Sequence, residues 1–320
     1  MPDICKMFKK ITLIVLLTFI SQNLKSQGCS DAGLCTAGSM KDNGADDEKW
    51  RFGINSQYGQ GDQKVDIFTQ QLEISRRFSD KLLVQVKMPW INTSGNLGSN
   101  QGIGDLVLTG NYKHRVSDDV IYNINLGFRV PTGNTNAGNI DVVANPGPPT
   151  SLPMPYQTGL GTFDVLTGMD IRYRSVWQFA LGFQLPLIQN NTNNFNALFA
   201  SMVPNASGYF YSANLKRKAD IVARIEKKFE LNKSIALFAN VIPIYHVGDD
   251  THTGFNGEKL VYQQSSGLTL NTGAGLMAEL SKSSVMRLSF AAPMITRKER
   301  PDGLTRHFVA GIEWHYKLIH

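Results

Sequence analysis

Charged and carboxamide residues recur at every second position in several segments of this 320-residue chain. In 163–174, FDVLTGMDIRYR, the alternating polar residues include Asp164, Asp170, Arg172 and Arg174. The same pattern elsewhere adds Gln85, Lys87, Lys113, Arg115, Arg224, Glu226 and Lys228. Because successive side chains of a strand point to opposite faces, these groups would gather on one face of a sheet. A surface with both signs of charge suits the binding or passage of water and small solutes.

The sequence offers little for catalysis or metal binding. Ser289 and His307 fall in neighbouring predicted strands, but no third residue orients them and no oxyanion hole is evident. No nucleophile elbow, phosphate loop or zinc spacing occurs. The loop GDDTHTG, at 248–254, groups two Asp and a His, but oxygen-rich metal sites need more ligands at defined positions. We therefore expect no enzyme, no catalytic residue, no cofactor and no metal site.

Period-two alternation from Trp50 onward predicts an all-β protein. In 177–187, WQFALGFQLPL, bulky apolar residues occupy one face, and Gln178, Ala180, Gly182 and Gln184 occupy the other. Twelve strands are predicted, at 50–58, 65–78, 81–91, 103–116, 120–131, 161–174, 176–188, 217–230, 234–247, 267–281, 284–295 and 304–319.

The predicted connections alternate between two lengths. Very short turns fall at 78–81, 116–119, 174–176, 230–234 and 281–284, and longer loops fall at 91–102, 132–160, 189–216, 248–266 and 296–303. An even number of strands of about ten residues, with turns at one end and loops at the other, is typical of a transmembrane antiparallel up-and-down β-barrel. A soluble β-sandwich usually has shorter strands and lacks this asymmetry. Such a barrel has a modest lumen, which either conducts or is filled by pairing charges.

Five prolines stand at nearly one height on alternate predicted strands, namely Pro89, Pro131, Pro186, Pro243 and Pro293. Each lies in a strand that ascends from a short turn, close to the long-loop rim. Proline cannot donate a hydrogen bond to a strand ladder, so we expect strand ends or rim bulges at these positions. A sharper alternative is that one proline loosens the wall enough for an apolar solute to leave sideways.

The N-terminus carries targeting signals. Lysines precede the apolar run 11–20, ITLIVLLTFI, and a polar stretch follows, as in a signal peptide of residues 1–26. Its removal takes away four Lys and one Asp and lowers the formal net charge from +6 to +3. The scattered basic residues do not predict nucleic-acid binding. Cys29 and Cys35 then predict a small disulfide loop, with a lipid anchor on Cys29 as the rival. Residues 27–49 would form a periplasmic or plug segment before a barrel of residues 50–320.

Three short motifs carry a family resemblance: GIGD at 102–105, VPTG at 130–133 and GLGTFD at 159–164. With them, residues 50–320 resemble the transporter-like bacterial outer-membrane barrels named for a role in the meta-pathway of phenol degradation. The resemblance implies a porin-like channel in the outer membrane, in contact with its lipid, for small hydrophobic or aromatic molecules. It supplies no substrate residues. The alternative is a structural or interaction barrel whose long loops bind a protein partner.

Overall fold

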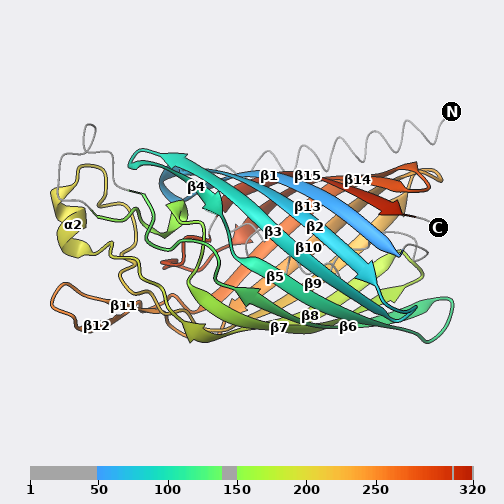
Figure 1. The fold of residues 1–320 in the computed structure, drawn as a ribbon, viewed down its shortest axis with the longest axis horizontal. Helices are drawn as coiled ribbons and strands as arrows, with labels where there is room; N and C mark the ends of the chain where they lie inside the picture. The colour runs from blue at the N-terminus through green and yellow to red at the C-terminus, as the bar shows by residue number, and fades with distance from the viewer. Residues whose placement is uncertain (1–48, 139–149, 305, 319–320) are drawn as a thin grey trace.

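The computed structural model describes residues 49–138, 150–304 and 306–318. Its antiparallel strands close into a barrel of twelve wall strands, which confirms the fold predicted from the alternation (Figure 1). The barrel closes because β1 pairs with the last strand and β2 pairs with β3. Residues 1–48 lie outside the described ranges. They include the predicted signal peptide, Cys29 and Cys35, and all of the predicted segment 27–49 except Lys49.

The wall strands match the predicted ranges within a few residues. They are β1 (Trp50–Gly61), β2 (Asp66–Arg77), β3 (Leu82–Gly95), β4 (Gly98–Ile103) with β5 (Leu106–Arg115), β6 (Val120–Val130), β7 (Thr162–Tyr173), β8 (Trp177–Gln189), β9 (Asp220–Glu230), β10 (Ile235–His246), β13 (Gly267–Ser281), β14 (Ser284–Ile295) and β15 (Arg306–Leu318). Strands β4 and β5 together form one wall strand, because both pair with β3.

The segment predicted as a loop at 91–102 is instead a hairpin. Strands β3 and β4 pair from Trp90 opposite Ile103 up to Gly95 opposite Gly98. The loop prediction was wrong because this segment is polar on both faces, and a hairpin beyond the barrel rim does not need the apolar alternation that marked the other strands.

Short elements occupy the long-loop end. They are the 3-10 turns η2 (Asp62–Lys64) and η3 (Met154–Tyr156), the helix α2 (Ala197–Met202) and the hairpin of β11 (Thr251–Thr253) and β12 (Lys259–Val261). The helix and the hairpin project beyond the wall strands, at the left of Figure 1. None of the helices in the described ranges is long and apolar enough to cross a membrane.

The two faces of the wall differ in polarity. On β8, the outward Phe179, Leu181 and Phe183 are exposed, whereas the inward Gln178 and Gln184 are 4% and 0% exposed. Aromatic pairs mark the outer surface near the short turns, among them Trp177 with Phe179 and Trp314 with Tyr316. An apolar belt edged by aromatic rings is the surface that a lipid bilayer contacts.

Three of the five prolines lie where the ladder changes register. Pro89 faces the break between β4 and β5, and Gly104 there donates its N–H to the Pro89 carbonyl oxygen, 2.8 Å away. Register shifts also accompany Pro186, opposite Asp164, and Pro293, opposite Asn271. A bulge lets the wall tolerate a residue without an N–H. Pro89 does not lie at the rim, however, because β3 continues to Gly95.

The other two prolines have different settings. Pro131 directly follows the end of β6. Pro243 lies inside β10, where the pairing with β13 is continuous but the pairing with β9 skips Ile242 and Pro243 without a register shift. Neither a strand end nor a bulge therefore explains Pro243.

Candidate functional site

The interior of the barrel is a buried polar surface built from inward-facing strand residues. Its densest ion-pair group joins residues of β9, β10 and β14. Arg224 on β9 and Arg287 on β14 both donate to the carboxylate of Glu226, the latter over 2.8 Å. The Asn240 side chain donates to the same carboxylate over 3.2 Å. Because a buried carboxylate is costly without partners, this convergence stabilises Glu226 as an anion inside the barrel.

A second group lies on β2, β3 and β15. Lys87 contacts Glu73 with 3.1 Å between its amine and the carboxylate, and both side chains are about 5% exposed. Gln85 donates to Glu73 and, over 3.0 Å, to Ser75. His315 approaches the same carboxylate to 3.9 Å. Positive and polar groups thus surround one acid, as they do around Glu226.

A third group runs along β6, β7 and β8. Arg129 lies 3.6 Å from the carboxylate of Asp164, which also accepts a 2.5 Å hydrogen bond from Gln184. Six residues further along β7, Asp170 accepts a 2.9 Å hydrogen bond from Asn123. These contacts distribute both signs of charge around the lumen instead of concentrating one sign on one wall.

The structure places most of the predicted lumen candidates on the inner face. Those buried or partly buried there are Gln85, Lys87, Lys113, Asp164, Asp170, Arg172, Arg224, Glu226 and Lys228. Two candidates are corrected. The Arg174 side chain is 63% exposed and pairs with Asp119, because Arg174 lies in the turn after β7 with a φ of 53°. Arg115 ends β5, and its side chain is 58% exposed beside Asp118.

Sequence reasoning missed several interior residues. Glu73, Arg129 and Arg287 lie on alternating strand positions, so a full count of the alternation would have found them. Asp302 and Arg297 belong to a loop without periodicity, and no sequence signal places them inside the barrel.

Two loop segments fold into the long-loop mouth. The first, residues 150–160, is buried throughout, including Leu152 and Tyr156, which are both 0% exposed. The Tyr156 hydroxyl accepts the N–H of Leu97 over 3.2 Å and lies 3.0 Å from the hydroxyl of Tyr209. A loop that borders only solvent would expose most of its side chains, so this segment closes the mouth from inside.

The second inward segment, residues 296–304, is held by ion pairs. Asp302 accepts from Arg297 over 2.9 Å and from Arg217 over 3.3 Å. Arg300 contacts Asp62, the first residue of η2, over 3.1 Å. Burial opposes ionisation of Asp302, but the two guanidinium groups outweigh it and hold its pKa well below the usual range of an aspartate. The segment is therefore docked through an ionised carboxylate at neutral pH.

The three sequence motifs of the resemblance meet at one point of the rim. Asp105, from GIGD, accepts the N–H of Gly133, from VPTG, over 3.1 Å and the N–H of Leu160 over 3.0 Å. Thr132 donates to Gly104 over 2.7 Å. A Cβ on Gly133 would lie 2.6 Å from the Cα of Gly159, so a side chain does not fit there. The motif residues thus anchor the end of segment 150–160 to the wall.

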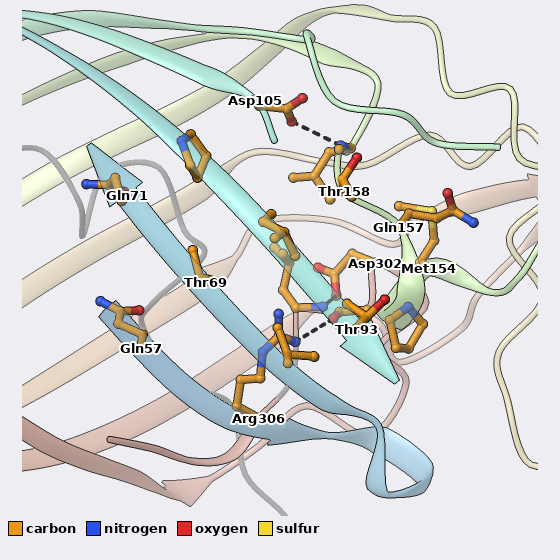
Figure 2. Close-up of a pocket in the computed structure, with 18 of the residues that line it drawn as sticks. Gln57, Thr69, Gln71, Thr93, Asp105, Met154, Gln157, Thr158, Asp302 and Arg306 are labelled. Carbon is orange, nitrogen blue, oxygen red and sulfur yellow. Dashed lines mark hydrogen bonds between the residues drawn. The ribbon is translucent and has the colours of Figure 1, made fainter. Parts of the chain in front are cut away.

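A cavity of about 90 Å³ lies beneath the two inward segments (Figure 2). Gln57, Thr69 and Gln71 line it from β1 and β2, and Gln157 and Thr158 line it from segment 150–160. A volume of this size accommodates several water molecules. A smaller cavity of about 20 Å³ lies towards the short turns, lined by Arg172, Lys228 and Arg287 among others.

Between the polar groups, aliphatic side chains also face inward. Val107, Leu166, Ala180, Val222, Ile242 and Ile244 form one buried cluster that reaches from β5 to β10. Val222 is 0% and Leu166 is 1% exposed. Apolar constrictions inside a channel resist wetting. The interior is therefore occluded in this conformation by both side chains and loop segments.

No family model and no curated protein matches the chain. Among solved structures it is similar to the NanC porin, with a TM-score of 0.47, 9% identity, and coverage of 83% of this chain and 100% of that one. For the KdgM porin in complex with disordered oligogalacturonate, the TM-score is 0.43 and the identity is 8%, with coverage of 84% of this chain and 99% of that one. For the toluene transporter TbuX of Ralstonia pickettii, the TM-score is 0.40 and the identity is 11%, with coverage of 85% of this chain and 90% of that one. With TM-scores below 0.5, these likenesses identify neither a family nor a solute, and the lumen is interpreted from its own residues.

Proposed function

We propose that the protein is an outer-membrane channel for the passive diffusion of small solutes. The observation that carries the proposal is the opposite polarity of the two wall faces. Large apolar side chains such as Leu181 and Ile124 are exposed outside, whereas charged and amide groups such as Glu226 and Asn123 are buried inside. Apolar outside and polar inside is the arrangement of membrane barrels that enclose an aqueous path.

The inward segments make this a gated channel. Segments 150–160 and 296–304 fill the mouth, and the aliphatic cluster narrows the interior. Passage of a solute therefore requires the segments to move outward. Polar contacts hold both segments, among them those of Asp105 with the first segment and of Asp302 within the second.

The interior chemistry favours polar solutes. A polar or charged wall replaces the hydration of a polar solute, while a hydrophobic or aromatic solute gains little from it. The motif resemblance favours hydrophobic or aromatic solutes instead. Flux of glycerol and of toluene into proteoliposomes distinguishes the two, and we expect glycerol to enter faster.

The test of the channel is conductance in planar bilayers. We expect wild type to open rarely, and the variant Asp105→Asn to open more often, because it loosens segment 150–160. Absence of both conductance and solute flux in wild type and in this variant would contradict the proposal.

A second candidate is an interaction barrel, and one observation favours it. The hairpin β11–β12 projects beyond the mouth and exposes Val261, and its turn exposes Phe255, at 53% and 59%. Exposed apolar side chains on loops often mark binding surfaces. Removal of this hairpin would abolish partner binding and spare conductance if it serves a partner, so the two functions are separable.

A further inference from the structure

The wall of the 90 Å³ cavity carries a patch of four neutral polar side chains from two adjacent strands. In the pairing of β1 with β2, Asn55 lies opposite Gln71, and Gln57 lies opposite Thr69. Directly opposed residues on one face of an antiparallel pair have their Cβ atoms about 5 Å apart. All four side chains line the cavity, and three of them are labelled in Figure 2. We call this set the amide patch.

The amide patch is not committed to the rest of the protein. Within the described part of the chain, its four side chains make no hydrogen bond. The Asn55 side chain is 8% exposed, and its carbonyl oxygen is buried without a partner there. Buried polar atoms are normally paired, so an orphan oxygen beside a cavity calls for a partner from the cavity.

The charged groups around the same cavity are already occupied. Asp302 is paired with two arginines, Asp105 accepts two backbone N–H groups, and Arg129 contacts Asp164. Arg306 donates to the carbonyl oxygen of Gly303 over 2.8 Å. A charged ligand would have to break these contacts, whereas a neutral ligand can use the amide patch and leave them intact.

Three further polar side chains of the lining, Thr93, Gln157 and Thr158, already have hydrogen-bond partners in the protein. Apolar residues supply much of the rest, among them Ile67, Pro89, Ile91, Leu160 and Leu304, from the wall and from both inward segments. The cavity thus combines uncommitted carboxamide and hydroxyl groups with carbon surfaces. Carboxamides both donate and accept, as does the threonine hydroxyl. Hydroxyl groups on a carbon chain match both properties.

We propose that the amide patch is a binding site for neutral polyhydroxylated solutes, of the class of glycerol and sugars, beneath the closed mouth. The inference rests on the proposed channel and names its solute class. Asn55 and Gln71 hydrogen-bond the solute hydroxyls, and the aliphatic lining contacts its carbon atoms. The cavity admits one small polyol while the mouth is closed.

The test measures the binding of glycerol to the purified full chain in detergent, with saturation-transfer NMR as the readout. In the double variant Asn55→Leu and Gln71→Met, the side chains keep their approximate size and lose the amides, and we expect affinity to fall at least tenfold. Thr69→Val is a milder variant that removes one hydroxyl, and we expect a smaller fall. The matched control is Gln70→Met, because Gln70 is the next residue of β2 and is exposed on the outer face.

Acetate and methylammonium of similar size serve as charged competitors. We expect neither to displace glycerol. Unchanged glycerol affinity in folded variants, or tighter binding of either ion, overturns the inference. Binding is measured without transport, so a channel that conducts but does not respond to these variants refutes the site alone. Glycerol binding without conductance refutes the channel alone.

Discussion

At the scale of single residues, partners of opposite sign stabilise charges that are buried in the interior. Glu226 is the clearest case, since two arginines and an asparagine donate to it. Removing one partner from a buried ion pair is far more costly than the pair is worth, because the remaining charge stays desolvated.

The Glu226→Gln variant tests this compensation. It leaves Arg224 and Arg287 without their carboxylate, and we expect the free energy of unfolding to fall by about 3–5 kcal/mol. The matched control is Glu230→Gln on the same strand and face. Glu230 is 63% exposed beside Lys228, and a surface pair contributes about 0–1 kcal/mol. Denaturant titration of the two variants in micelles measures both values, and equal losses would contradict the account.

Asp105 acts as an anchor, since its carboxylate accepts two backbone N–H groups from segments distant in sequence. In Asp105→Asn one N–H loses its acceptor, at a cost of about 1–3 kcal/mol. We expect faster proteolysis within 150–160 with little change in the barrel itself. Asp66→Asn is a control at the same rim, because the Asp66 carboxylate accepts hydrogen bonds from Tyr58 and Gln60 of its own hairpin and none from segment 150–160. Equal proteolysis of both variants would show that Asp105 is no anchor.

At the scale of elements, the strands were predictable from sequence and the inward segments were not. In β8 every outward residue from Trp177 to Leu187 is bulky and apolar, because that face borders an apolar environment. This requirement makes polar and apolar residues alternate along the strand, and the alternation is visible in the sequence. Segment 150–160 fills an irregular mouth and obeys no period. The cavity escaped prediction for the same reason, since nine of its 21 lining residues come from the inward segments.

The docking of segment 296–304 should depend on pH only in strong acid. The pKa of Asp302 is lowered from its ordinary value of 3.8, so its contribution to stability is complete above 3.8 and is lost as pH falls below it. Between pH 7 and 5 we expect constant protection of this segment from proteases.

The Asp302→Asn variant should reproduce the strong-acid state at pH 7, with exposed cleavage sites in 296–304. A segment that undocks near pH 6 in wild type, or that stays protected in the variant, would refute the role of Asp302.

The five prolines that the sequence predicted at the rim yield another element-scale expectation. Bulges and a strand end accommodate four of them. We therefore expect unchanged solute flux when alanine replaces Pro89, Pro131, Pro186 or Pro293. Pro243 faces outward at an interruption of the pairing with β9, so Pro243→Ala is the variant most able to tighten the wall. Loss of toluene flux in that variant alone would support lateral exit of an apolar solute. Unchanged flux in all five variants would exclude it.

At the scale of the whole molecule, the barrel is a polar interior held in an apolar shell and closed at one end by its own loops. Inside the barrel, aliphatic side chains from β5 to β10, between Val107 and Ile244, narrow the lumen. In the proposed channel, opening therefore requires outward movement of the mouth segments, which the polar anchors oppose.

Single-channel recording in planar bilayers tests this central claim most directly, with wild type and the double variant Asp105→Asn and Asp302→Asn compared at neutral pH. The account predicts rare, brief openings for wild type and frequent or lasting openings of similar unit conductance for the variant, because only the closing segments are released. A folded variant that remains as silent as wild type would contradict the account.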